Sequence, residues 1–246
     1  ESEQRLRQFV ADASHELRTP LASIQGYTQL LQKGSADEEL ALARIASESA
    51  RMSGLVEDLL LLARLDAGRE LASDPVDLIP LAIDAVSDAH AAGPDHEWVL
   101  DLPQFDDEDE DCVSCTVAGD ESALRQVFAN LVNNARIHTP AGTRVKVGVQ
   151  VIGGGASAPG FVRMSVADDG PGIPPELRAT VFDRFVRGDT SRSRQGKGSS
   201  GLGLSIVSSI AEALGGRVDV DTVCEGEAKP GEHGTIFSVI LPALGE

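Results

Sequence analysis

The sequence predicts two domains of different class, an N-terminal antiparallel helical hairpin followed by a two-layer α/β sandwich. Apolar residues recur at helical spacing over the first 66 residues. A composition break that contains Gly68, Ser73 and Pro75 follows at 67–77, and strand-like alternation then mixes with helical patterns. We therefore place a hairpin domain at 1–68, a linker at 69–77 and the sandwich at 78–246.

The first helix is predicted from Leu6 to Leu31, and Lys33-Gly34 marks its end. Ser35 is the predicted N-cap of a second helix that runs to about Asp66. This second helix has more apolar surface than one partner helix can cover. We therefore expect two hairpins to form a dimeric four-helix bundle, with packing against the downstream domain as the alternative.

The sandwich is built from strand and helix patterns that alternate along the second domain. Valine alternates with other residues over 145–151, and a Gly- and Pro-rich connection leads to a second alternating run at 161–167, which predicts an antiparallel hairpin. Further strands are expected at 97–102 and 234–241, and helices at 80–91, 121–137 and 202–214.

Composition narrows the functional classes. The chain has 246 residues, of which 41% are hydrophobic and 24% charged, and this excludes a disordered chain. Its formal charge of -18 disfavours direct nucleic-acid binding. The sequence has no apolar run of roughly 18 residues, and three cysteines suit a reducing compartment. We expect the cytoplasmic portion of a membrane sensor, whose membrane contact would come only through N-terminal segments outside this sequence.

His15 lies nearly opposite the apolar stripe of the first helix, and Thr19 shares its face at i+4. The carboxylate of Glu16 is placed to accept a hydrogen bond from imidazole Nδ1, which would leave Nε2 as a nucleophile. Taken alone, this triple is also what an exposed helical histidine with acidic neighbours looks like.

The surrounding string, Phe9-Val-Ala-Asp-Ala-Ser-His-Glu-Leu-Arg-Thr-Pro-Leu21, resembles the H-box of sensor histidine kinases. In that family the motif carries the phosphorylated histidine, so the resemblance implies that His15, Glu16 and Thr19 are catalytic.

Asn130 and Asn134 lie on one flank of the predicted helix from Glu121. Two amide oxygens at a helix edge suit Mg²⁺ bound together with a nucleotide, although the pair taken alone slightly favours ordinary surface asparagines. The stretch from Asn130 to Thr139 resembles the N-box of the same family. It departs from the pattern because Ile137 stands where a phosphate-binding lysine is common and His138 where a tyrosine often is. Arg136 or an arginine of the lid could then supply the cation.

Asp168 is predicted to face the interior of the sandwich, where a buried carboxylate needs hydrogen-bond donors. Backbone amides could supply them, and so could the exocyclic amine of an adenine. The run from Asp168 through Gly170 and Gly172 to Ile173 resembles the first glycine box of the family. The resemblance implies that Asp168 reads adenine while the glycines let the base approach the backbone.

Two more glycine motifs and an aromatic motif follow in the order of the family. The residues Gly198-Ser-Ser-Gly201-Leu202-Gly203-Leu204 resemble the second glycine box of the family. Those that begin at Gly234-Thr235 resemble the third. Between the first and second boxes, Phe182-Asp-Arg184-Phe resembles the F-box. It opens a basic stretch that includes Arg187 and that we interpret as a lid over the triphosphate.

Taken together, these motifs imply an ATP-dependent protein-histidine kinase that uses Mg²⁺, with the ATP-binding fold shared by gyrase-type topoisomerases and Hsp90-type chaperones. The family further implies a homodimer, transfer from His15 to an aspartate in a response-regulator receiver domain, and phosphatase activity toward that regulator. One alternative is a nucleotide-gated interaction module that binds ATP without transferring phosphate. Another is a kinase whose output is mainly the phosphatase activity.

The acidic run at 106–111 is interpreted as a solvated loop because like charges at this density repel. Cys112 and Cys115 follow it, and Cys224 and a histidine could complete a zinc site with them. Redox sensing by the cysteines is the other possibility. We consider both of these minor alternatives.

Overall fold

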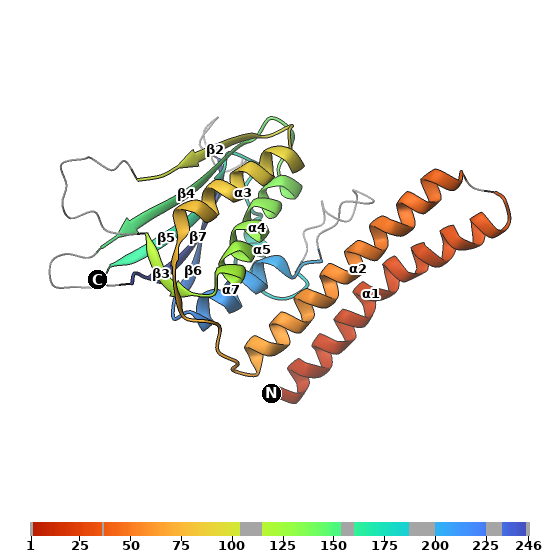
Figure 1. Ribbon diagram of the computed structural model, residues 1–246, viewed down its shortest axis with the longest axis horizontal. Coiled ribbons are helices and arrows are strands. Elements are labelled where there is room, and N and C mark those ends of the chain that lie inside the picture. Colours follow the sequence, from red (N-terminus) through yellow and green to blue (C-terminus); the bar gives the residue numbers. More distant parts are fainter. Residues whose placement is uncertain are drawn as a thin grey trace. The chain divides into compact units, whose positions relative to one another are not determined.

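The structure is a computed structural model that describes residues 2–35, 37–103, 115–153, 160–186, 200–224 and 233–244. The chain divides into two compact units, Glu1–Arg64 and Leu65–Glu246 (Figure 1). Most contacts between residues lie within one unit or the other, so the two units are described separately. The combination of a helical hairpin and an α/β domain confirms the predicted fold class.

The first unit is a hairpin of two long helices, α1 (Ser2–Gln32) and α2 (Glu38–Asp66) (Figure 1). Helix α1 ends as predicted, because Gly34 adopts a left-handed φ of 65° that lets the chain turn. The predicted N-cap was wrong. Asp37 caps α2 by accepting a hydrogen bond from the Leu40 amide at 2.9 Å, whereas the Ser35 hydroxyl turns back to the Lys33 carbonyl.

The hairpin covers only part of its apolar surface. On α2, the side chains of Ala41, Leu55 and Leu62 are buried. A second set of large apolar side chains stays exposed, at Val10 and Leu21 of α1 and at Leu42, Val56 and Leu60 of α2. In the parts of the chain that the structure describes, no helix is both long and apolar enough to cross a membrane.

The second unit is built on a five-stranded sheet with the strand order β2-β4-β5-β7-β6. Its strands are β2 (Glu97–Asp101), β4 (Arg144–Ile152), β5 (Phe161–Asp168), β6 (Arg217–Val223) and β7 (Gly234–Pro242). Only the β2–β4 pair is parallel. The predicted hairpin is confirmed, since β4 and β5 pair antiparallel with Val147 opposite Val166.

Three helices cover one face of this sheet: α3 (Leu78–Ala92), α4 (Glu121–His138) and α7 (Gly203–Ala213) (Figure 1). Asp77 and Asp120 cap α3 and α4 through their carboxylates, which fixes where each helix begins. Helix α4 packs between α3 and α7. Its Phe128 is fully buried, and burial of such a side chain stabilises the fold by roughly 1.5–3 kcal/mol.

A smaller sheet joins two short strands, β1 (Asp74–Asp77) and β3 (Thr116–Gly119), in antiparallel register. Strand β1 occupies the last residues of the predicted linker and leads directly into α3. A single bridge from Val117 to Ala243 ties this pair to the end of β7. Nothing in the sequence analysis had assigned β1, β3 or β6.

Candidate phosphotransfer and nucleotide site

His15 and Thr19 lie on α1 with both side chains exposed, one helical turn apart. The histidine therefore faces solvent, as the angular pattern of the apolar residues predicts. An exposed imidazole is accessible both to a phosphate donor and to a docking protein.

Glu16 lies beside this histidine, but its carboxylate leans toward the second helix. Its Oε2 is 3.8 Å from Nη2 of Arg51 on α2, and the Nη1 of the same guanidinium is 3.7 Å from Oε2 of Glu48. The guanidinium of Arg51 thus forms ion pairs with two carboxylates, one on each helix of the hairpin. The side chain that would orient the imidazole is anchored by α2, a contact that the sequence of α1 alone gives no means of finding.

In the second unit, Asp168 ends β5 with its side chain turned toward the helices. Its Oδ1 accepts a hydrogen bond from the Gly170 amide at 3.0 Å, and the Thr235 amide donates to the same carboxylate. Burial raises the pKa of Asp168 to about 6, the neighbouring Asp169 adds to this, and the two backbone donors oppose it. A buried carboxylate with remaining acceptor capacity suits an amine ligand.

The glycines after Asp168 are required by close contacts. A Cβ on Gly170 would lie 2.6 Å from Cγ2 of Thr139 and 2.8 Å from Oδ1 of Asp168. Gly172 has a φ of 76°, and a Cβ there would overlap the carbonyl of Val223. The first glycine motif is therefore pressed against both the end of α4 and the end of β6.

Asn130 on α4 faces the start of α7, because a Cβ on Gly203 would lie 3.3 Å from its Oδ1. Its Nδ2 is enclosed and finds no hydrogen-bond acceptor among the described residues. Such an amide fits a nucleotide site, since a phosphate oxygen could accept from Nδ2 while Oδ1 stays available to Mg²⁺. Asn134 lies one turn on and is half-buried.

Arg136 is one of the cations predicted to replace the family lysine, and in the structure its side chain is turned away from Asn130. Its Nη2 donates to Asn133 at 2.7 Å, and its side chain packs against Gly93 after α3, on the flank of α4 away from Asn130. His138 is exposed at the end of the helix. Arg184 of the F-box donates to Asp66 at 2.6 Å and is half-buried.

The F-box and the second glycine motif meet in the structure. Phe185, which adopts a φ of 61°, donates its amide to the Gly201 carbonyl at 2.8 Å, and a Cβ on Gly201 would lie 2.9 Å from the Phe185 backbone. Phe182 packs edge-on against Phe237 of β7. Leu202 is fully buried and Leu204 half-buried at the start of α7. Arg187 and Gly198 lie outside the described residues.

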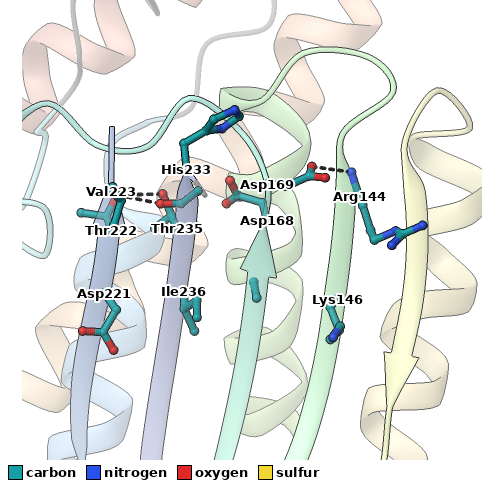
Figure 2. A pocket seen from close by; sticks show the side chains of 12 residues that line it. Arg144, Lys146, Asp168, Asp169, Asp221, Thr222, Val223, His233, Thr235 and Ile236 are labelled. Atoms are coloured by element: carbon teal, nitrogen blue, oxygen red, sulfur yellow. Dashed lines mark hydrogen bonds between the residues drawn. The ribbon is translucent and has the colours of Figure 1, made fainter. Parts of the chain in front are cut away.

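A cavity of about 320 Å³ opens at the strand ends around Asp168 (Figure 2). Asp168 and Thr235 line it together with His233, whose Nδ1 donates to the Gly170 carbonyl at 2.8 Å. Lys146 and Ile236 also line the cavity, from the face of the sheet opposite the helices. The cavity therefore overlaps the predicted adenine site only in part.

Sequence reasoning missed Thr222 of β6 as a member of this region. Its hydroxyl accepts from the Ile173 amide at 2.8 Å, which joins the last residue of the first glycine motif to the sheet. In an alternating strand a threonine is indistinguishable from a packing residue, so nothing in the sequence pattern marks it. Among the described residues no group of three or more His, Cys, Asp or Glu side chains could hold a metal ion, and Cys112 falls outside them.

Two family models match the chain. Residues 119–245 match the model described as histidine kinase-, DNA gyrase B-, and HSP90-like ATPase, which covers more than half of the chain. Residues 5–68 match the His kinase A (phospho-acceptor) domain. The first match contains Asp168 and both asparagines, and the second contains His15.

The chain is 52% identical over 99% of its length to the "Probable sensor histidine kinase TcrY" and 47% identical over 99% to the sensor histidine kinase TrcS, both from Mycobacterium tuberculosis. It spans about half of these relatives, 47% and 45% respectively.

Three solved structures share the fold. The mycobacterial sensor histidine kinase MprB is 31% identical with a TM-score of 0.56, and the match covers 70% of this chain and 100% of that one. The Acinetobacter baumannii histidine kinase AdeS is 24% identical, with a TM-score of 0.68 over 94% of this chain and 98% of that one. The histidine kinase ThkA in complex with the response regulator protein TrrA is 22% identical, with a TM-score of 0.68 over 98% and 64%. The chain belongs to the two-component sensor histidine kinases, within the superfamily whose ATPase domain is shared with DNA gyrase B and HSP90.

Proposed function

We propose that this chain uses ATP to phosphorylate His15 and passes the phosphoryl group to an aspartate of a response-regulator receiver domain. The observation that carries the proposal is the exposed imidazole of His15 on a phospho-acceptor hairpin, in a chain whose ATPase-like domain also holds the half-buried carboxylate of Asp168, which we propose as the adenine reader. Phosphoryl transfer needs mostly alignment and charge neutralisation, and the two units provide the acceptor and the nucleotide site.

In the proposed reaction, Nε2 of His15 attacks the γ-phosphorus of ATP. The Nε2–P bond forms as the bond from phosphorus to the bridging oxygen breaks, and ADP leaves. Glu16 accepts the Nδ1 proton and so keeps the electron pair on Nε2 available. Bound Mg²⁺ would neutralise phosphate charge, and Asn130 and Asn134 are the residues proposed to hold it.

We propose four further properties of the whole protein. Partnering with a response regulator is supported by the related ThkA structure, which contains one. Homodimerisation is supported by the apolar side chains that the hairpin leaves exposed. Thr19, on the exposed face beside His15, is proposed to help place water when the regulator is dephosphorylated. Attachment of the protein to a membrane, through segments outside this sequence, also remains a proposal.

The test is incubation of the chain with Mg²⁺ and γ-labelled ATP, with His15→Gln and His90→Gln as a matched pair. His90 is a second exposed helical histidine, so its variant should keep the label while His15→Gln loses it entirely. Phosphohistidine should be lost in acid and survive alkali.

Label that persists in His15→Gln would show that another residue is the acceptor. An unlabelled wild type that still binds ATP would instead favour the nucleotide-gated interaction module. In that case Ile137→Lys is the first substitution to try, because it restores the cation that the family commonly has at this position.

A further inference from the structure

The hydroxyl of Thr222 on β6 connects the first and third glycine motifs. Its Oγ1 lies 2.8 Å from the Ile173 amide, 3.1 Å from the Gly234 carbonyl and 3.2 Å from Oγ1 of Thr235. Figure 2 shows Thr222 and Thr235 side by side on neighbouring strands, next to Asp168. One side chain thus contacts Ile173, 49 residues before it, and Gly234, 12 residues after it.

The direction of each hydrogen bond follows from the groups involved. The Gly234 carbonyl can only accept, so the Thr222 hydroxyl donates its one proton to that carbonyl. The Ile173 amide can only donate, so Thr222 accepts from it. Since Thr222 has no second proton, the Thr235 hydroxyl must donate to Thr222. The hydroxyl is therefore fully used, with one bond donated and two accepted.

The carbonyl of Ile173 is held from the same strand end. It accepts from Nε of Arg178 at 2.9 Å and from the Cys224 thiol at 3.0 Å. Gly172 fits closely against the Val223 carbonyl, with no space for a Cβ. The backbone N–H and C=O of Ile173 are thus both hydrogen-bonded to side chains at the end of β6, Thr222 and Cys224, and the carbonyl also accepts from Arg178 of the short helix α5 (Pro175–Arg178).

The hydrogen bonds of Thr222 are linked through Thr235 to Asp168, the proposed adenine-reading carboxylate. The Thr235 amide donates to Asp168, and the Thr235 hydroxyl is oriented by Thr222. We propose that Thr222 is a positioning residue for adenine recognition: without touching the nucleotide, its hydroxyl holds the Gly172–Ile173 turn and Thr235 in the register that aims Asp168 at the base. The inference rests on the proposed function, because it takes Asp168 as the adenine reader.

Thr222→Val removes the hydroxyl but keeps the shape of the side chain, and Thr222→Ser keeps the hydroxyl. We expect Thr222→Val to weaken ATP binding about tenfold, which corresponds to losing one well-made hydrogen bond. Thr222→Ser should stay within about twofold of wild type. The kcat of autophosphorylation at saturating ATP should change little in either variant, so the effect should appear in KM.

Nucleotide selectivity separates positioning from general structural damage. Inosine triphosphate carries a carbonyl where ATP has the amine, so its binding gains nothing from Asp168. Thr222→Val should therefore lose ATP affinity while its affinity for inosine triphosphate changes by less than about twofold, and the preference for ATP should fall about tenfold. Thr143→Val, at another buried threonine outside this network, is the matched control and should keep the preference.

Binding of both nucleotides to the full chain by calorimetry keeps the result independent of kinase activity. Unchanged ATP selectivity in Thr222→Val would overturn the proposal, and so would an equal loss for both nucleotides together with a lower melting temperature. If wild type binds ATP selectively but never labels His15, the proposed function fails. A loss of selectivity confined to Thr222→Val would still support the role of Thr222.

Discussion

The Asp168 carboxyl is the group in this protein whose protonation matters most for the proposed adenine site. Its pKa is raised to about 6 because it is buried, so it is ionised at neutral pH and becomes protonated as the pH falls below 6. Only the ionised form offers all its oxygens as acceptors to an adenine amine.

We expect ATP affinity to be constant above about pH 7 and to fall by up to tenfold per pH unit below about 6. Asp168→Asn should bind ATP roughly 10- to 100-fold more weakly and lose this pH dependence, because a hydrogen bond to a charged group is removed. Calorimetry from pH 5 to 8 measures both. His233 lies beside the same site, so a pH dependence that survives in Asp168→Asn would assign it to a group other than Asp168.

The same burial has the opposite effect on stability. The pKa of Asp168 in the folded state lies above the ordinary aspartate value of 3.8, so the ionised carboxylate costs the fold about 3 kcal/mol above pH 6 and nothing below about pH 4. The amides of Gly170 and Thr235 would lose a charged acceptor in Asp168→Asn, which offsets part of the gain. We therefore expect this variant to be about 1–2 kcal/mol more stable at pH 7.5 than wild type and to show no gain at pH 4.5. Urea unfolding at the two pH values tests this, and equal shifts at both would contradict it.

Single residues also show where sequence reasoning stops. The period of the apolar residues suffices to predict that His15 is exposed and that Asp168 faces inward, because both depend only on local geometry. Arg51 and Thr222 act across elements, through Glu16 and Ile173 respectively. Their contacts depend on which helix turn or strand lies opposite, and no spacing along the chain specifies that.

At the scale of elements, the long helices and the β4–β5 hairpin were predicted, whereas strands β1, β3 and β6 were missed. The β4–β5 hairpin and α4 carry many periods of their pattern, and tertiary packing reinforces it. Strands β1 and β3 have four residues each, which is too short for a period to show. Strand β6 does alternate valine with polar residues over 217–223, and this signal could have assigned it. Because β6 was not predicted, its contact with the first glycine motif through Thr222 could not be predicted either.

The contact between Gly172 and the end of β6 can be tested by comparing alanine substitutions at two glycines. Gly172 and Gly142 have similar left-handed φ values of 76° and 87°, but only Gly172 has backbone atoms where a Cβ would lie. Alanine should cost roughly 1–2 kcal/mol of stability at Gly142 and leave ATP affinity within about twofold. At Gly172 the same change must also displace Val223, so ATP affinity should fall at least about tenfold. Equal losses in the two variants would show that backbone strain alone is responsible.

At the scale of the whole molecule, the hairpin is incomplete by itself. Leu42, Val56 and Leu60 lie within about 40° of one another on the α2 wheel, and they are 52%, 42% and 53% exposed. Ala41, Leu55 and Leu62 occupy a different side of α2 and are already buried. A second apolar stripe on a helix that has one partner favours association with another hairpin.

Leu60→Lys should break this association. In a symmetric dimer the substitution occurs twice, and each buried leucine contributes roughly 1.5–3 kcal/mol, so the dimer should weaken by about 10² to 10⁴-fold. Ile83→Lys is the matched control, because Ile83 is an equally large apolar side chain, 46% exposed, on α3 of the other unit. Sedimentation equilibrium should give a dimer for wild type and for Ile83→Lys, and a monomer for Leu60→Lys. A wild type that is monomeric at all concentrations would instead mean that the stripe is covered within one chain, and dimerisation would then have no physical basis in this hairpin.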